Sequence, residues 1–341
     1  MKCAVISFTC SGGRLAERLA GELNQRGYQA ENWCLPKWAG EFPECSVWDK
    51  GLSEWCGLRF QDCSGLIFIG ACGIAVRLIA PFVRTKTKDP AVVVADEKGE
   101  FAISLLSGHL GGGNALAREV AEILGGQAVI TTATDVQGKF SVDVWAKANG
   151  LLLPSLVYAK EISAAVLAGE KIGFSCPYPV DGTVPEELSG GEAARLQIEV
   201  GVRRSKRPVF LSRSLVIGIG CRRGKSKEAI AAFAEQVLRE QNLAPEAVRC
   251  AATIDIKKEE EGLAAYCKEQ GWPVRYFTAE ELLAVEGAFT ASPFVKQTTG
   301  VDNVCERAAV KASHGRLLVR KQASDGVTVA VAEENRRIYF G

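Results

Sequence analysis

The chain has 341 residues, enough for two domains or three small ones and enough to bury a core without disulfides or metal ions. Lys and Arg number 41 against 40 Asp and Glu, a net charge of +1, which excludes a nucleic-acid-binding protein held by a broad basic surface. Apolar residues are 47% and charged residues 24%, which excludes a disordered chain.

Residues 1–150 alternate between apolar runs and amphipathic segments, the pattern of a doubly wound α/β domain. The short all-apolar runs bounded by glycine are typical of buried strands in a parallel sheet. Strands are expected at residues 3–8, 30–35, 66–69, 91–95, 101–106 and 128–131, and helices at 14–25, 74–79, 111–124 and 142–149.

The rest of the chain divides at a basic run, residues 203–207. Prolines punctuate residues 151–212, which predicts a small middle domain ending in a linker. The α/β pattern returns in residues 213–341, a second α/β domain. In it we expect strands at 215–219, 251–254, 274–277, 317–319 and 327–331, and helices at 226–239, 259–270, 279–283 and 303–312.

No membrane partner, nucleic-acid partner or protein metal site is predicted. The longest uncharged apolar stretch, residues 64–76, is too short to span a bilayer, and residues 3–10 lead into a helix without a signal-peptide cleavage site. The twelve Cys have no C-x-x-C spacing, and the two His form no cluster with them. We expect structural thiols in a cytoplasmic protein.

Two glycine-rich turns carry cations and are candidate anion sites. The first follows a strand at Gly218 and Gly220 and continues through Arg222, Arg223 and Lys225. It misses the P-loop pattern at Ile219 and the dinucleotide pattern at Arg223, so ATP or NAD binding is a minor alternative. The second spans residues 70–88 and contains Gly73, Arg77, Arg84, Lys86 and Lys88, where a strand of an open sheet ends. An ordinary basic surface loop remains the alternative for both turns.

The densest motif is residues 104–114, where Ser107 and His109 precede Gly111, Gly112, Gly113 and Asn114. Consecutive glycines at a helix start suggest backbone that approaches a ligand closely. A histidine in such a loop suits a general acid or base, with capping as the alternative. No G-x-S-x-G elbow surrounds Ser107, so a serine nucleophile is a minor alternative. Thr132 and Asp135 end the next strand, where they bind ligand or cap a helix.

Several of these strings resemble the cobalt-precorrin-5A hydrolase family of anaerobic cobalamin biosynthesis. Gly113 stands where that family commonly has Ala. The strings, in matching order over nearly the whole chain, are residues 73–77, 79–81, 89–94, 104–109, 130–135, 218–224, 296–301 and 305–309.

The resemblance implies a substrate that is a cobalt-bound, ring-contracted tetrapyrrole carrying a δ-lactone. Water opens the lactone, acetaldehyde leaves, and cobalt-precorrin-5B remains. Cobalt arrives with the substrate, so no separate cofactor is expected. Two other classes stay open: a non-catalytic tetrapyrrole-binding or channelling protein, and a nucleotide-dependent enzyme. Oligomerisation and transient contact with neighbouring pathway enzymes also stay open.

We therefore assign roles as hypotheses. His109 is the general base or acid, Asp96 or Asp135 orients it or replaces it as base, and the amides of Gly111 and Gly112 stabilise the oxyanion. Arg77, Lys86 and Arg222 pair with substrate carboxylates. The full candidate set is His109, Asp96, Asp135 and Ser107 for catalysis, and Gly12, Gly73, Arg77, Lys86, Gly111, Gly112, Asn114, Thr132, Gly220 and Arg222 for substrate binding.

Overall fold

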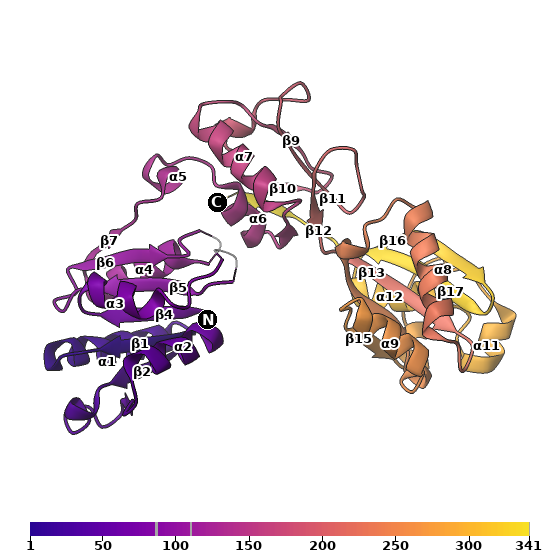
Figure 1. Cartoon of the computed structure of the whole chain (residues 1–341). Coiled ribbons are helices and arrows are strands. Elements are labelled where there is room, and N and C mark those ends of the chain that lie inside the picture. Colours follow the sequence, from indigo (N-terminus) through magenta and orange to yellow (C-terminus); the bar gives the residue numbers. More distant parts are fainter. Residues whose placement is uncertain (86–87, 110, 341) are drawn as a thin grey trace. The chain divides into compact units, whose positions relative to one another are not determined.

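A computed structural model describes residues 1–85, 88–109 and 111–340 (Figure 1). The chain divides into two compact units, residues 1–144 and 145–341. No helix within the described ranges is long and apolar enough to cross a membrane.

The first unit is built around a seven-stranded sheet of order β3-β2-β1-β4-β5-β6-β7. The order reverses direction between β1 and β4, which confirms the doubly wound prediction. The elements are β1 (Lys2–Ser7), α1 (Cys10–Gln25), β2 (Gln29–Cys34), η1 (Pro36–Trp38), β3 (Ser46–Val47), α2 (Leu52–Asp62), β4 (Gly65–Ile69), α3 (Cys72–Ile79), β5 (Ala91–Ala95), β6 (Phe101–Leu106), α4 (Gly113–Leu124), β7 (Gln127–Val129), α5 (Ala133–Val136) and α6 (Val142–Ala148), which runs across the boundary into the second unit.

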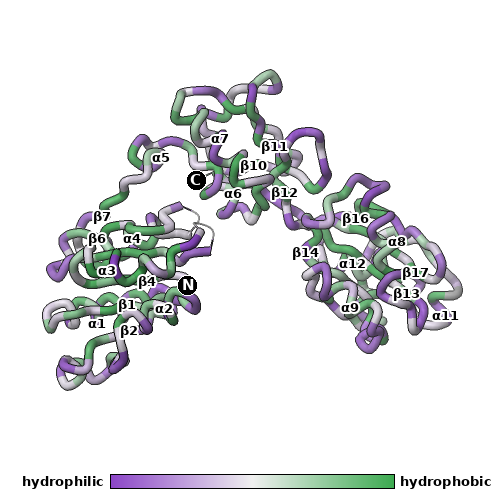
Figure 2. The backbone as a smooth tube through the Cα atoms, viewed as in Figure 1, coloured by the Kyte–Doolittle hydropathy of each residue, from purple (hydrophilic) through white to green (hydrophobic). Residues whose placement is uncertain are grey.

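The central strands of this sheet are continuous hydrophobic runs (Figure 2). These runs are expected for strands whose residues are buried on both faces of a sheet. Helices α1 and α4 cover one face, and α2 and α3 cover the other. Helix α4 begins at Gly113, two residues later than expected, because Gly112 adopts a left-handed φ of 86° that stops the helix there.

Strand β6 reverses the direction of the sheet. Strands β1, β2, β4 and β5 are parallel, whereas β6 is antiparallel to β5, and β7 is parallel to β6. The carboxyl ends of β1, β4 and β5 therefore lie at one edge of the sheet, and the carboxyl ends of β6 and β7 lie at the opposite edge.

The second unit contains a small sheet of order β8-β12-β11-β9 and a five-stranded sheet of order β15-β14-β13-β17-β16. On the larger sheet, α8 and α9 cover one face, and α10 and α12 cover the other. The elements are β8 (Leu151–Leu152), α7 (Leu156–Leu167), β9 (Gly173–Ser175), β10 (Val180–Gly182), η2 (Glu186–Leu188), β11 (Gln197–Gly201), β12 (Val209–Ser212), β13 (Leu215–Cys221), α8 (Lys227–Glu240), η3 (Pro245–Ala247), β14 (Val248–Ile254), η4 (Asp255–Lys257), α9 (Glu261–Glu269), β15 (Val274–Phe277), α10 (Ala279–Leu283), α11 (Pro293–Thr299), α12 (Cys305–Ser313), β16 (Arg316–Ser324), β17 (Val327–Glu333) and β18 (Ile338–Phe340).

Strand β18 pairs with β10 of the middle segment instead of extending the larger sheet. The Phe340 ring stacks on Trp145 with 5.2 Å between ring centroids. Asn149 donates from Nδ2 to the Tyr339 carbonyl and accepts the Tyr339 amide on Oδ1. Residues 338–340 thus pack with the middle segment, although sequence placed them in the C-terminal domain.

One cysteine pair corrects the expectation of free thiols throughout. Cys34 and Cys45 form a disulfide with 6.2 Å between their Cα atoms. Cys34 ends β2 and Cys45 precedes the edge strand β3, and Phe42 between them packs on the first turn of α1 at Gly13. The disulfide closes this loop without the C-x-x-C spacing on which the sequence argument relied.

Candidate functional site

His109 lies between two carboxylates at the edge where β6 and β7 end. Its Nε2 is 2.9 Å from Oδ2 of Asp135 and 3.0 Å from the Thr134 hydroxyl. Its Nδ1 is 3.8 Å from Oδ2 of Asp143. The His109 side chain is 21% exposed, so a ligand can reach it, while its partners limit its rotation. An imidazole held in this way has the geometry of a general acid or base.

Asp135 is fixed as an ionised carboxylate by its other partners. Arg118 donates to Oδ1 at 2.7 Å, and Asn114 donates to Oδ2 at 2.9 Å. Burial alone would raise the pKa of Asp135, but the hydrogen bonds from Arg118 and His109 hold it below its ordinary value. Because an ionised carboxylate can only accept, the proton of the neutral imidazole belongs on Nε2, which leaves Nδ1 with a lone pair.

Asn114 positions this pair from a buried site at the start of α4. It is 4% exposed, accepts from the Ser104 hydroxyl at 2.8 Å and donates to the Thr132 hydroxyl at 3.0 Å. These contacts and the one to Asp135 engage its whole amide. Asn114 thus contacts both Thr132 and Asp135, and the expectation that Asn114 and Thr132 bind substrate stays a prediction.

The glycines of the 104–114 loop are required by the loop itself. A Cβ on Gly111 would collide with the Ser107 side chain, and one on Gly113 would lie 2.6 Å from the Leu106 carbonyl oxygen. Gly112 has a φ of 86°, and its amide donates to the His109 carbonyl at 2.9 Å. Close packing therefore accounts for Gly111 and Gly113, while the expectation that these glycines admit a ligand stays a prediction. The Gly112 amide is engaged, while the proposed role of the Gly111 amide stays a prediction.

Ser107 and Asp96 do not join His109. The Ser107 hydroxyl donates to the Asp89 carbonyl at 3.0 Å, at the amino end of β5. The Asp96 carboxylate accepts from the amides of Lys98 at 2.8 Å and Phe101 at 2.6 Å, and so closes the β5–β6 turn. That turn is at the opposite end of β6, so the hypothesis that Asp96 orients His109 is wrong and Asp135 takes that place.

The remaining N-terminal candidates lie away from His109. Gly12 follows β1, and its amide donates to the Thr9 hydroxyl at 3.1 Å, which is a helix cap. Gly73 follows β4, and exposed Arg77 donates back to its carbonyl at 3.3 Å. Both glycines lie at the β1–β4 edge. Lys86 lies outside the described residues, so its role stays a prediction.

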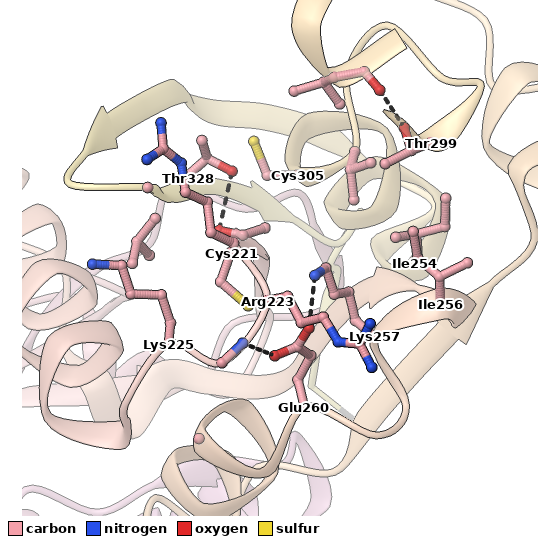
Figure 3. Close-up of a pocket in the computed structure, with 18 of the residues that line it drawn as sticks. Cys221, Arg223, Lys225, Ile254, Ile256, Lys257, Glu260, Thr299, Cys305 and Thr328 are labelled. Carbon is pink, nitrogen blue, oxygen red and sulfur yellow. Dashed lines mark hydrogen bonds and ion pairs between the residues drawn. The ribbon is translucent and has the colours of Figure 1, made fainter. Parts of the chain in front are cut away.

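A second candidate site is a cavity of about 1300 Å³ in the C-terminal sheet (Figure 3). It lies where β13 and β14 end, as expected for a ligand site in an open α/β sheet. Ile254, Ile256, Val295 and Val304 supply apolar lining. Its cationic lining residues are Arg222, Arg223, Lys225, Lys227, Lys257 and Lys321, against the acidic residues Glu259, Glu260, Glu261 and Asp325.

Glu260 organises the cationic loop of this cavity. Its carboxylate accepts from the Gly224 amide at 2.9 Å and from Lys257 at 2.8 Å (Figure 3). Burial alone would raise the pKa of Glu260, but these two donors hold it below its ordinary value. Lys225 pairs with Asp325 at 2.7 Å. Glu260 therefore shapes the loop from inside and neutralises Lys257.

Two guanidinium groups of the loop remain available for a ligand. Arg222 and Arg223 are exposed and have no ion pair within the described residues. The Arg222 amide donates to the Gly326 carbonyl at 2.8 Å, and its side-chain stem packs on Gly326. A Cβ on Gly220 would lie 2.5 Å from the Thr328 hydroxyl. Arg222 and Gly220, both expected to bind substrate, thus line one cavity.

Comparison with known proteins matches two domain models of one family to the two parts of the chain that contain these sites. The family model described as "Cobalamin synthesis G N-terminal" matches residues 54–135, and that described as "Cobalamin synthesis G C-terminus" matches residues 215–332. The protein named "Cobalt-precorrin-5A hydrolase" from Salmonella typhimurium is 34% identical over 96% of each chain. The chain belongs to the cobalt-precorrin-5A hydrolase family. A relative of the same name from Priestia megaterium is 35% identical over 80% of this chain and 79% of its own. "Protein CobE" from a Sinorhizobium species is 34% identical over 35% of this chain and 79% of its own.

Sequence reasoning missed several residues that build the two candidate sites of this member of the cobalt-precorrin-5A hydrolase family. Thr134 contacts His109, and Arg118 contacts Asp135. Asp143 faces His109 from a separate helix. Arg118 lies four residues after Asn114 on the polar side of α4, a spacing that brings side chains together on a helix. The contacts of Asp143 with His109 and of Glu260 with the Gly224 amide had no such local signal, because these partners lie far apart in the sequence.

Proposed function

We propose that this protein hydrolyses cobalt-precorrin-5A: it opens the δ-lactone with water and releases acetaldehyde, leaving cobalt-precorrin-5B. The observation that carries the proposal is a relative of that name at 34% identity over 96% of both chains. The His109–Asp135 pair supports it, because hydrolysis of a lactone requires a base that activates water.

The first step adds water across the lactone. His109 takes a proton from water through Nδ1, and the water oxygen bonds to the carbonyl carbon. The tetrahedral intermediate then expels the carbinol oxygen, which takes the proton from His109. The products are a carboxylic acid and a carbinol, with no oxidation or reduction. Asp135 holds the imidazole in the required tautomer throughout.

The second step breaks a carbon–carbon bond. A base removes the carbinol hydroxyl proton, the C=O bond of acetaldehyde forms, and the bond to the macrocycle breaks. The conjugated, cobalt-bound ring of the substrate accepts the electron pair, so the step needs no electron sink from the protein. The enzyme would thus be a hydrolase that acts on a carbon–carbon bond.

The cationic cavity would bind the carboxylates of the macrocycle. Its volume of about 1300 Å³ exceeds the range of about 300–1,000 Å³ typical of small-ligand sites. Arg222 and Arg223 offer planar guanidinium groups that bind carboxylates bidentately. The apolar lining suits the ring itself.

The test is an anaerobic incubation with cobalt-precorrin-5A in which released aldehyde is trapped with a hydrazine reagent. Acetaldehyde in proportion to enzyme, without added cofactor, is the expected result. The cationic cavity also suits a tetrapyrrole carrier, the alternative function. A carrier would shift the corrinoid spectrum and release no aldehyde above background, and that result would refute the hydrolase.

A further inference from the structure

Asp143 presents a second carboxylate to His109, from the start of α6. Its Oδ2 lies 3.8 Å from Nδ1 of His109. Its Oδ1 accepts from the Ser141 hydroxyl at 2.7 Å and from the Val144 amide at 3.1 Å. The Asp143 side chain is 11% exposed. One oxygen is therefore anchored, and this anchoring aims the other at the imidazole.

The two carboxylates contact the imidazole differently. Asp135 makes a hydrogen bond of 2.9 Å to Nε2, whereas the distance of 3.8 Å from Asp143 to Nδ1 is too long for one. Because the Nε2 proton is committed to Asp135, Nδ1 has a lone pair, and so has Oδ2 of Asp143. Two acceptors side by side bind a molecule that donates two hydrogen bonds.

Water fits that description. An oxygen at about 2.8 Å from both acceptors completes a triangle over the 3.8 Å separation, with ordinary hydrogen-bond lengths on both sides. One hydrogen then points to His109 and the other to Asp143, and a lone pair of the oxygen points away from both. A carbonyl carbon approaching from that side meets the lone pair.

We propose that Asp143 is a catalytic residue that holds the hydrolytic water together with His109. The inference rests on the proposed function. When Nδ1 takes one proton, the second hydrogen stays bonded to Asp143, and the oxygen attacks the lactone carbonyl carbon. The imidazolium that forms lies between two carboxylates, which stabilise it. The proton returns to the leaving carbinol oxygen, so atoms and charge balance with one water consumed.

A purely structural role is the alternative, because an acidic residue in the first turn stabilises a helix. The variant Asp143→Asn separates the two. Asn retains Oδ1 for Ser141 and the Val144 amide, but it replaces Oδ2 with an NH2 group that cannot accept a hydrogen bond from water. Ser141→Ala is the matched control, since it weakens the anchor and leaves Oδ2 in place.

The experiment measures acetaldehyde release from cobalt-precorrin-5A by the full-length variants. Asp143→Asn should lower kcat about 10²–10³-fold with KM nearly unchanged and with wild-type thermal unfolding. Ser141→Ala should lose far less. Adding formate should restore part of the activity to Asp143→Ala, because formate supplies the missing carboxylate, and a structural role gives no such rescue.

Two results would overturn the inference, and they are distinguishable. Wild-type kcat in Asp143→Asn, or an Asp143→Ala loss that formate does not relieve, leaves the hydrolase intact and removes Asp143 from its mechanism. No acetaldehyde from the wild-type protein refutes the proposed function itself, and the role of Asp143 with it.

Discussion

Asn114 offers a measurable link between the packing of the His109 site and its activity. Replacement by Ala removes three hydrogen bonds, from Ser104 and to Thr132 and Asp135. The two bonds to neutral hydroxyls contribute about 1 kcal/mol each, and the one to the carboxylate about 2 kcal/mol. Thr132 and Asp135 are partly exposed and regain some hydration. We expect a net loss of about 3 kcal/mol in local stability.

Hydrogen exchange measured by mass spectrometry is the assay, because it reports each segment separately. A loss of about 3 kcal/mol accelerates exchange about 100-fold in α4, β6 and β7. Peptides from residues 213–332 should exchange at the wild-type rate, which gives an internal control. Protection of β6 and β7 within about twofold of wild type would refute the reasoning.

The same variant separates positioning from substrate binding. Asn114 is buried, and its amide is engaged by protein groups, so its loss should lower kcat through Asp135 and His109 while KM changes little. A raised KM with unchanged kcat would contradict this and support direct contact between Asn114 and the substrate.

Four further outcomes are expected. His109→Ala should lower kcat at least about tenfold in the aldehyde-trapping assay, compared with the 10²–10⁴-fold typical of acid–base groups. Joint replacement of Arg222 and Arg223 by Ala should raise KM about tenfold or more and leave kcat nearly unchanged. Gly218→Ala should cost about 3 kcal/mol or more in urea unfolding, because its Cβ would collide with a backbone carbonyl of α12. Asp135 has a lowered pKa when folded, so its stabilising contribution is present above its unfolded pKa of about 3.9 and lost as pH falls through the folded value. Asp135→Asn should therefore flatten the dependence of unfolding free energy on pH below about pH 4.

Three of these outcomes have a control or a result that would contradict them. Joint replacement of Lys206 and Arg207 by Ala removes two exposed cations outside the cavity and should leave KM unchanged. Unchanged turnover in His109→Ala with intact folding would exclude it from the mechanism. A cavity role for the arginines fails if both double variants raise KM equally. Wild-type unfolding in Gly218→Ala would show that α12 shifts to admit the methyl group.

The strands and most helices could be predicted because local chemistry determines them. An all-apolar run between glycines predicted β4, and a second all-apolar run predicted β5. Thr278 with Glu281 predicted the capping box that begins α10. The hairpin of β16 and β17 followed from Ser324 to Gly326. These features depend on residues within one element and its flanks.

The direction of β6 was missed, although the sequence contains a signal for it. Only residues 96–100 connect β5 to β6, too few for the crossover that parallel neighbours need. An antiparallel β6 moves Ser107 and His109 to the edge opposite Asp96, which is why Asp96 could not orient the histidine. The pairing of His109 with Asp143 had no comparable signal, since it depends on where α6 begins in space.

The pairing of β18 with β10 has a consequence for how the chain folds during synthesis. Asp181 in β10 leaves the ribosome 156 residues before Arg337, its bidentate partner just before β18. Strand β10 therefore lacks its partner strand, and Trp145 lacks the Phe340 ring that stacks on it, until nearly all of the described chain has been translated. A chaperone that binds exposed aromatic residues would bind Trp145 during this interval, and the five-stranded sheet can form before Trp145 is buried.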